Sequence, residues 1–374
     1  MLPLPKDWEI KTFRDISTIN QGLQIPISQR LKAPTEHAKF YITIQALNNR
    51  KEFEYIKTYN ESVVCHKDDI LMTRTGNTGM VITNIEGVFH NNFFKINFDR
   101  TLINKDFLVY FLSLEQTQKT ILKKAGTSTI PDLNHNDFYS LLIPLPPLNE
   151  QIAIANILSD VDHYLYSLDA LILKKESVKK ALSFELLSQR KRLKGFNQAW
   201  QRVRLGDICE ITTGSLDANE MVHYGKYRFY TCAKEYYFID KYAFDTEAIL
   251  ISGNGAYVGY VHYHKGKFNA YQRTYVLDNF SEHIIFIKYF LTMFLQSHIQ
   301  TNRNEGNTPY IVMATLKDFE IPLPSLNEQI AIADILSTLD KEIANLKNKK
   351  RQFENIKKAL NHDLMSAKIR VLKK

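Results

Sequence analysis

The chain has 374 residues, of which 44% are apolar and 24% charged, and its formal net charge is +8. This length exceeds what one ordinary core serves, so we expect two domains, and the composition excludes a disordered or fibrous protein. There is no leader-like N-terminus and no apolar run of about 18 residues, and the three cysteines form no CxxC pair, so we expect a cytoplasmic protein without a membrane span, disulfide framework or zinc ribbon.

The first β-rich module is predicted over residues 1–148. Its β-prone runs lie at 40–44, 79–85 and 93–98, and an amphipathic helix candidate follows at 105–124. The same order recurs over residues 196–326, with β-prone runs at 228–231 and 274–277 and a helix candidate at 283–300. This order predicts an α+β fold with two mixed, β-rich modules rather than a doubly wound sheet.

An internal repeat relates the two modules. Residues 143–159 read IPLPPLNEQIAIANILS and residues 321–337 read IPLPSLNEQIAIADILS, differing only at Pro147/Ser325 and Asn156/Asp334. These two segments are 178 residues apart. The same offset relates the ends of the two units, where KKALSFELL at 179–187 corresponds to KKALNHDLM at 357–365. The starts also match, because Trp8, Asp15, Ile16 and Gly22 correspond to Trp200, Asp207, Ile208 and Gly214. Shared ends and divergent middles indicate a common scaffold with two modules of one fold that recognise different things.

Each IPLP segment precedes a long predicted helix, at 149–195 and 327–374. Asn149 and Asn327 are expected N-caps, with Glu150 and Glu328 in the first turn. The first apolar stripe is predicted at Ile157, Val161, Tyr164, Leu168, Leu171, Val178 and Leu182. The second is predicted at Leu336, Leu339, Ile343, Leu346, Phe353 and Leu360, continuing to Leu364, with Lys350 and Lys357 as polar interruptions. We expect the helices to form an antiparallel intramolecular coiled coil with pseudo-twofold symmetry; pairing with another chain is the alternative.

Polar side chains suited to DNA are frequent in the predicted loops of both modules. Arg pairs well with guanine, Asn or Gln with adenine, and Lys with phosphate. The DNA-binding candidates are Arg74, Asn77, Asn91, Asn92 and Lys95 in the first module, and Arg228, Asn254, Tyr257, Lys265, Gln272 and Arg273 in the second. Surface or turn duty is the alternative for each of them.

No catalytic motif is present in the sequence. The SGNGA segment at 252–256 is interpreted as a turn, because no GxGxxG, Walker A, NPPY or DPPY motif accompanies it. His262 and His264 share one face of a predicted strand but have no carboxylate or cysteine at metal-site spacing, and Pro131-Asp132 lacks the ExK of a nuclease centre. We therefore expect neither a catalytic nor a metal site.

The two units, each opening with the Trp and Asp-Ile pattern and closing with PLPxLNEQIAIAxIL and a long helix, resemble the specificity subunits of type I restriction-modification systems. The resemblance spans essentially the whole chain. It implies two target-recognition domains that each read half of a bipartite site in double-stranded DNA, with the paired helices as the spacer. Arg14 departs from the pattern, which has Gly206 at the equivalent place in the second unit, and this puts the geometry of the first turn in question.

The resemblance also implies two methylation subunits and restriction subunits as partners. S-adenosylmethionine, ATP and magnesium are expected on those partners, and no cofactor on this chain. The partner-binding candidates are Asn149, Glu150, Gln151, Asn327, Glu328 and Gln329, with Glu150 and Glu328 expected to be exposed; packing of module against helix is the alternative. A standalone DNA methyltransferase or nuclease, and a structural or RNA-binding coiled-coil protein, are the competing functions.

Overall fold

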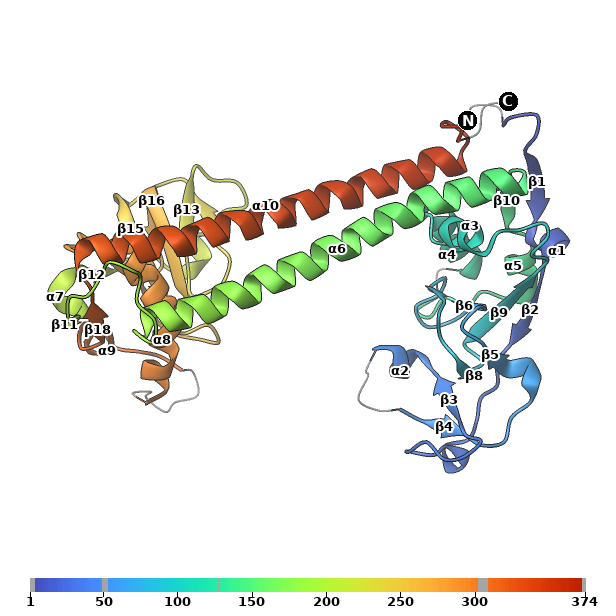
Figure 1. The fold of residues 1–374 in the computed structure, drawn as a ribbon, viewed down its shortest axis with the longest axis horizontal. Coiled ribbons are helices and arrows are strands. Elements are labelled where there is room, and N and C mark those ends of the chain that lie inside the picture. The colour runs from blue at the N-terminus through green and yellow to red at the C-terminus, as the bar shows by residue number, and fades with distance from the viewer. Residues whose placement is uncertain (1–3, 49–52, 127, 302–308, 372–374) are drawn as a thin grey trace. The chain divides into compact units, whose positions relative to one another are not determined.

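A computed structural model describes residues 4–48, 53–126, 128–301 and 309–371 of the chain (Figure 1). The chain divides into two compact units. Unit 1 comprises Met1–Asp169 and Lys349–Lys374, and unit 2 comprises Ala170–Asn348. Each unit therefore contains one module and a part of both long helices. Among the described helices, none combines the length and the apolar composition that crossing a membrane requires.

The module of unit 1 is a β-rich α+β structure, as predicted. Three sheets form, with strand orders β2-β9-β6-β7, β4-β3-β8-β5 and β1-β10. The strands are β1 Glu9–Thr12, β2 Ser17–Gln21, β3 Lys39–Ile42, β4 Tyr55–Ile56, β5 Val64–Cys65, β6 Ile70–Thr73, β7 Val81–Ile82, β8 Gly87–Phe89, β9 Phe93–Phe98 and β10 Leu142–Leu145. The α-helices are α1 Phe13–Ile16, α2 Ile44–Asn48, α3 Lys105–Leu112, α4 Glu115–Ala125 and α5 His135–Tyr139. The single helix predicted at 105–124 is thus two helices, α3 and α4.

Unit 2 repeats this plan with one larger sheet. Six strands pair in the order β12-β17-β15-β16-β13-β14, and β11 pairs with β18. The strands are β11 Gln201–Arg204, β12 Glu210–Thr213, β13 Tyr227–Tyr230, β14 Tyr237–Ile239, β15 Phe244–Ser252, β16 Val261–Ala270, β17 Thr274–Asp278 and β18 Glu320–Leu323. The α-helices of the module are α7 Leu205–Ile208, α8 Ile284–Thr301 and α9 Met313–Lys317. The one-turn helix α1 forms with Arg14 as α7 does with Gly206, so the departure does not alter that turn.

Gly22 and Gly214, equivalent in the repeat, occupy the same close approach between backbone segments. A Cβ at Gly22 would lie 2.2 Å from Phe89 O, and one at Gly214 would lie 1.9 Å from Ala270 O. Only glycine fits so near a carbonyl oxygen. The shared glycines of the two starts therefore have a packing reason.

The IPLP segments bring each module back to its own beginning. β10 pairs antiparallel with β1 in the register Glu9↔Leu145 to Thr12↔Leu142. β18 pairs with β11 in the same way, from Gln201↔Leu323 to Arg204↔Glu320. The long helix thus starts beside the first strand of its own module.

The two long helices are α6, Leu148–Leu187, and α10, Leu326–Met365 (Figure 1). Each begins one residue before the asparagine predicted as its N-cap, so Asn149 and Asn327 lie inside the first turn. Each also ends earlier than the predicted boundaries at 195 and 374. Proline at 146 and 324 keeps the preceding residues extended, and the helices follow directly.

The helices pair with each other in an antiparallel arrangement, which confirms the predicted intramolecular pairing. In unit 1, Lys350 lies 2.7 Å from Asp169, and Tyr164 contacts Phe353 with ring centres 4.6 Å apart. In unit 2, Lys175 lies 2.7 Å from Glu342. Partner numbers fall along α10 as they rise along α6. Ion pairs across the seam fix this register.

The predicted stripe of α10 is confirmed, but that of α6 is partly wrong. Leu336 and Ile343 are buried, as expected. On α6, Leu168 is buried, but Leu171 is 40% exposed and Val178 46% exposed, while the neighbouring Ile172 is only 6% exposed. Two of the seven positions predicted for the α6 stripe are therefore exposed.

Each module has a core that continues onto the long helices. In unit 1, Phe13, Phe107 and Phe138 pack with Leu158 of α6 and Leu364 of α10. In unit 2, Leu205, Phe286 and Leu295 pack with Leu187 of α6 and Leu336 of α10. Each module is thus attached to both helices by apolar burial.

Candidate nucleic-acid interface

A turn after a central strand forms the first part of the candidate interface in unit 1. The turn follows β6, and Gly79, with φ of 90°, donates its N–H to Thr73 O at 2.8 Å. Gln118 of α4 donates from Nε2 to Gly79 O at 2.7 Å. Glycine is required because other residues adopt this left-handed conformation only with strain. The turn after β6 is therefore held in place by a side chain of α4.

Unit 2 builds the same turn after β15. Gly259, with φ of 79°, donates to Ser252 O at 2.7 Å, and Gln296 of α8 donates to Val258 O at 2.7 Å. Gln118 and Gln296 differ by the repeat offset of 178. The turn of unit 2 is one residue longer between its anchoring strand residue and its glycine, and Tyr257 stands in this longer segment.

Two further segments converge on each turn. In unit 1, Arg74 N–H donates to Asn92 O at 2.8 Å, and Leu133 N–H donates to Arg74 O at 2.8 Å. In unit 2, Gly253 N–H donates to Arg273 O at 2.8 Å, and Ile311 N–H donates to Gly253 O at 2.9 Å. We call these sets the turn clusters: residues 74–79, 90–92 and 131–133 in unit 1, and residues 253–259, 271–273 and 309–311 in unit 2.

The turn cluster of unit 1 brings together Arg74, Asn77, Asn91 and Asn92. Asn77 is exposed and takes a left-handed conformation with φ of 66°. The Oδ1 of Asn91 is buried and has no hydrogen-bond partner among the described residues. Asn92 uses its backbone to hold Arg74.

Two of the predicted residues in unit 1 are already engaged inside the module. The Arg74 side chain is 17% exposed and donates to Asp132 Oδ2 at 2.8 Å. Lys95 donates to Val64 O at 2.8 Å. In this conformation Arg74 fixes the third segment of the cluster and Lys95 ties β9 to β5, so neither cation is presented freely to a ligand.

The turn cluster of unit 2 brings together Asn254, Tyr257, Gln272 and Arg273. Tyr257, Gln272 and Arg273 are exposed. Neither Lys265 nor Arg228 belongs to this cluster. Lys265 pairs with Glu247 at 3.0 Å, four register positions from the turn, or about 13 Å along the strand. Arg228 lies on β13, its guanidinium 4.3 Å from the centre of the Tyr236 ring.

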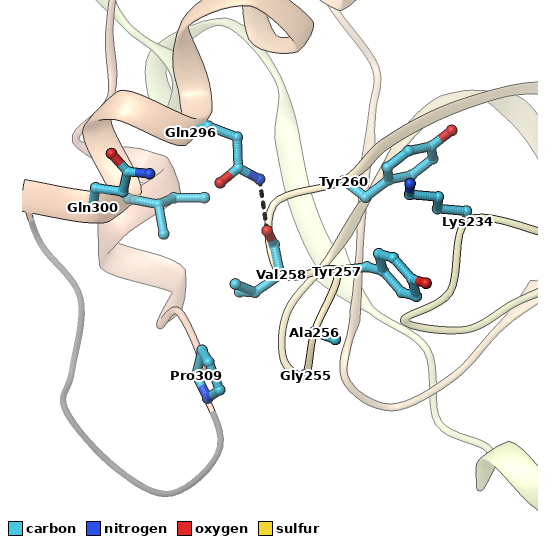
Figure 2. Close-up of a pocket in the computed structure, with 10 residues that line it drawn as sticks. Lys234, Gly255, Ala256, Tyr257, Val258, Tyr260, Gln296, Gln300 and Pro309 are labelled. Atoms are coloured by element: carbon cyan, nitrogen blue, oxygen red, sulfur yellow. Dashed lines mark hydrogen bonds between the residues drawn. The ribbon is translucent and has the colours of Figure 1, made fainter. Parts of the chain in front are cut away.

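A pocket of about 380 Å³ adjoins the turn cluster of unit 2 (Figure 2). Lys234, Tyr257 and Tyr260 line one side, and α8 lines the other with Gln296 and Gln300. The ammonium of Lys234 lies 5.2 Å from the centre of the Tyr257 ring. A cation beside exposed aromatic faces is suited to nucleic acid, because it offers a phosphate contact and a stacking surface together.

The histidines of β16 pack in aromatic clusters with Tyr230 and Tyr260. His262 packs against Tyr260 with ring centres 4.7 Å apart, and its Nε2 lies 2.8 Å from Ala233 O. Burial lowers the pKa of His262. His264 contacts Tyr230 instead, with Nδ1 3.1 Å from the tyrosine hydroxyl. Both rings therefore serve packing in this structure.

Lys234, Tyr260 and Tyr310 were not among the candidates from sequence. Tyr310 is 39% exposed and belongs to the third segment of the cluster. A signal for that segment exists, because Pro131 and Pro309 stand at the same offset of 178 as the IPLP motifs. Lys234 has no counterpart in a recognisable motif, since the modules diverge there.

The glutamates expected to be exposed at the helix starts are buried, and that expectation is wrong. Trp8 Nε1 donates to Glu150 Oε2 at 3.1 Å, and Arg370 binds the same carboxylate from Nε at 2.7 Å. Arg370 also donates to Asp7 at 2.9 Å. Glu150 is 2% exposed. A buried carboxylate needs such donors, which accounts for the paired Trp and Arg.

Unit 2 repeats this contact. Trp200 Nε1 donates to Glu328 Oε2 at 3.2 Å, and Arg192 donates from Nη2 at 2.7 Å. We call the two sets, Trp8–Glu150–Arg370 and Trp200–Glu328–Arg192, the carboxylate clamps. In each clamp the arginine follows the end of one long helix and the glutamate begins the other. The clamps therefore close the helix pair at both ends.

Gln151 and Gln329 are buried as well. Gln151 accepts from Asn104 N at 2.9 Å and donates to Pro146 O at 2.8 Å. Gln329 accepts from His283 N at 3.0 Å and donates to Pro324 O at 3.0 Å. The packing alternative thus accounts for the Glu and Gln of both repeats, while Asn149 and Asn327 remain exposed.

Comparisons with known proteins agree with this architecture. The family model described as "Type I restriction modification DNA specificity domain" matches residues 5–175 and 197–355. The chain is 25% identical, over 99% of its length and 95% of the relative, to the type I restriction enzyme MjaVIII specificity subunit of Methanocaldococcus jannaschii. It is 38% identical to the EcoDI specificity subunit of Escherichia coli over 45% of this chain, and the match spans only 37% of that relative.

Solved structures share the fold. The S subunit of a type I restriction-modification system from M. genitalium has a TM-score of 0.64 at 20% identity, covering 97% of this chain and 98% of that one. The HsdS subunit from Thermoanaerobacter tengcongensis has a TM-score of 0.52 at 18% identity, covering 98% of both chains. The family model covers both halves of the chain and the neighbours reproduce its architecture, so the chain belongs to the family of type I restriction-modification DNA specificity subunits.

Proposed function

We propose that each unit reads one half of a bipartite site in double-stranded DNA through its turn cluster. One observation supports this most strongly: the two clusters keep the same backbone hydrogen bonds while the exposed side chains on them differ. A shared frame with different donors and acceptors is what two different half-sites require, because base edges are read by side chains of matching hydrogen-bond pattern.

The clusters support a narrower set of proposed reading residues than the sequence alone. In unit 2 we propose Asn254, Tyr257, Gln272 and Arg273, with Lys234 as a phosphate contact. In unit 1 we propose Asn77, Asn91 and Asn92. The net charge of +8 favours association with a polyanion before any base is read.

We further propose that two methylation subunits bind the exposed faces of the two repeated helix starts. Ile152 is 41% exposed and Ile330 38% exposed, at equivalent positions one turn after the exposed Asn149 and Asn327. Two copies of one surface suit two copies of one partner. Restriction subunits complete the assembly, and S-adenosylmethionine, ATP and magnesium act on the partner subunits in the cytoplasm.

A segment exchange tests the reading of half-sites. Residues 16–142 are replaced by the corresponding module of another family member, and the methylated sequences are mapped in cells that carry the methylation subunits. We expect one half-site to change and the other to stay. A change in both half-sites, or in neither, would contradict separate reading by the two units.

The partner surface is tested by Ile152→Glu and Ile330→Glu, singly and together. Each single variant is expected to bind one methylation subunit instead of two, and the double variant none, as measured by mass photometry of the complex. Leu122→Glu, at a 45% exposed position on α4, is the control. Full assembly by the double variant would show that the repeated segments serve packing only.

A further inference from the structure

A three-residue contact in unit 1 links the module to both long helices at once. The hydroxyl of Tyr110, on α3, donates to Asp162 Oδ2 of α6 at 2.8 Å. Lys357 of α10 donates to the other oxygen of this carboxylate. The ammonium also lies 5.4 Å from the centre of the Tyr110 ring. One carboxylate therefore joins three elements.

Unit 2 contains the same contact with the helices exchanged. Tyr289 of α8 donates to Asp340 Oδ2 of α10 at 2.6 Å, and Lys179 of α6 binds the other oxygen. The ammonium lies 5.5 Å from the centre of the Tyr289 ring. The exposed fractions also agree, at 27% for Lys179 and 28% for Lys357. Two modules of divergent sequence have thus kept one attachment.

The charge states support a durable contact. Burial, followed by the hydrogen bond to the carboxylate, raises the pKa of both Tyr110 and Tyr289, so both hydroxyls remain protonated donors. Burial opposes ionisation of Asp340, but the hydrogen bonds from Lys179 and Tyr289 outweigh it and hold the pKa of Asp340 below its ordinary value. Ionised acceptors form the stronger class of hydrogen bond.

The position of each contact along its helix suggests what it does. In unit 1 the carboxylate clamp holds α6 at Glu150, and Asp162 lies twelve residues further on, or about 18 Å along the helix axis. The apolar core attaches the module to both helices without directional bonds, whereas two separated polar contacts define its orientation on the helix. A turn of about 35° would present the turn cluster one base pair further around the DNA.

We propose that Tyr110–Asp162–Lys357 and Tyr289–Asp340–Lys179 are positioning joints that fix the orientation of each module on the helix pair, and thereby the number of base pairs accepted between the half-sites. This inference rests on the proposed function, because it presupposes two half-sites. The joint residues do not touch DNA; they act through the placement of the turn clusters.

The test measures spacer length rather than overall activity. The full chain is produced with its methylation subunits in cells that carry a plasmid library in which the two half-sites are separated by every spacer length around the natural one. Methylation of each member is read by sequencing. The variants are Tyr110→Phe, Lys357→Met and their combination, and Lys119→Met, from an exposed ion pair with Glu115 on α4, is the control.

We expect the combined variant to methylate the same half-sites at the natural spacer and at spacers one base pair shorter and longer, each within about threefold of the natural one, because one base pair corresponds to about 35°. Lys357→Arg alone keeps a charged donor to Asp162, and this variant is expected to accept only the natural spacer, as the parent does. The control is expected to keep it throughout.

Two results would overturn the joint. One is an unchanged single spacer in the combined variant. The other is loss of methylation at every spacer in Tyr110→Phe while its circular dichroism and melting match the parent, because a loosened joint leaves the half-sites readable. Failure of the proposed function is distinguishable, since the unaltered chain would then direct no methylation to any bipartite site.

Discussion

The carboxylate clamp of unit 2 predicts a large and specific loss of stability when its arginine is removed. Glu328 has a side chain that is only 1% exposed, and Arg192 supplies its charged partner. In Arg192→Met the carboxylate keeps the Trp200 hydrogen bond but loses its counter-charge. An ionised group left unpaired in a protein interior is strongly destabilising. Removing the charge of the carboxylate itself, as in Glu328→Gln, should lower the stability much less.

The magnitude follows from burial and from the size of the unit. Breaking a buried ion pair by removing one partner costs about 3 to 5 kcal/mol, and we take about 3 because Arg192 is itself 28% exposed. Unit 2 has about 180 residues, for which each kcal/mol lowers the melting temperature by about 2 to 4 °C. We therefore expect Arg192→Met to lower the melting of unit 2 by about 6 to 12 °C.

The sequence offers a direct assay, because it contains two tryptophans, one in each unit. In a Trp8→Phe background, thermal unfolding followed by Trp200 fluorescence reports on unit 2 alone. Arg192→Met/Glu328→Gln should regain at least half of the loss, since the neutral amide still accepts from Trp200. Arg202→Met, which breaks the exposed pair with Glu320, should shift melting by less than about 3 °C. A drop in Arg192→Met no larger than in Arg202→Met would refute the reasoning.

Three further predictions concern pH, recognition and spacing. Burial lowers the pKa of His262 below its ordinary 6.5, so the contribution of neutral His262 to the stability of unit 2 is fully present above pH 6.5 and is lost as pH falls from there toward the folded-state pKa. His262→Gln should flatten the fall in the melting temperature reported by Trp200 between about pH 7.5 and 5, and an identical slope would contradict this. Tyr257→Ala should weaken binding to duplex DNA by about tenfold, because it removes a proposed side-chain contact to a base edge. Half-site preference should relax only on the side that unit 2 reads, as measured by selection from randomised duplexes, and equal relaxation on both sides would count against it. Four residues inserted at the same level of α6 and α10 add about 6 Å and a net rotation of about 40°. The methylated site should therefore keep both half-sites and gain one or two base pairs of spacer. An unchanged spacer in an active variant would show that the helices do not set the spacer length.

The sequence predicted the scaffold well because the repeat is strongest there. The stripe of α10 was placed correctly, but on α6 Leu171 and Val178 were chosen, although Ile172 is the buried residue and Lys179 pairs with Asp340 of α10. Both choices follow alternating steps of three and four, so apolar spacing alone cannot separate them. Subtracting the offset of 178 from Lys350 and Lys357 of α10 gives positions 172 and 179, which are the positions observed on α6. Lys179 was not chosen from the sequence because a lysine does not count toward an apolar stripe.

The candidate interface was less predictable because it depends on pairing between distant segments. Arg74 has the chemistry of a base-reading residue, yet Asp132, 58 residues away, engages it. Glu150 and Glu328 have the chemistry of surface residues, yet a tryptophan and an arginine at least 128 residues away in the sequence enclose each of them. The joints combine a tyrosine from a diverged module with residues of both helices, a combination that helical periodicity does not reveal.

The order of synthesis treats the two units differently because the helix pair threads through both. Unit 2 is one continuous segment, Ala170–Asn348, whereas unit 1 needs Lys349–Lys374 to complete its core. Leu364 and Met365 pack with Phe107 and Leu158 there, so this apolar surface stays open on the ribosome until after unit 2 has emerged. The first module to be made is thus the last to close, and a released chain that is truncated before residue 349 would carry a complete second unit and an exposed first one, the kind of surface that chaperones bind.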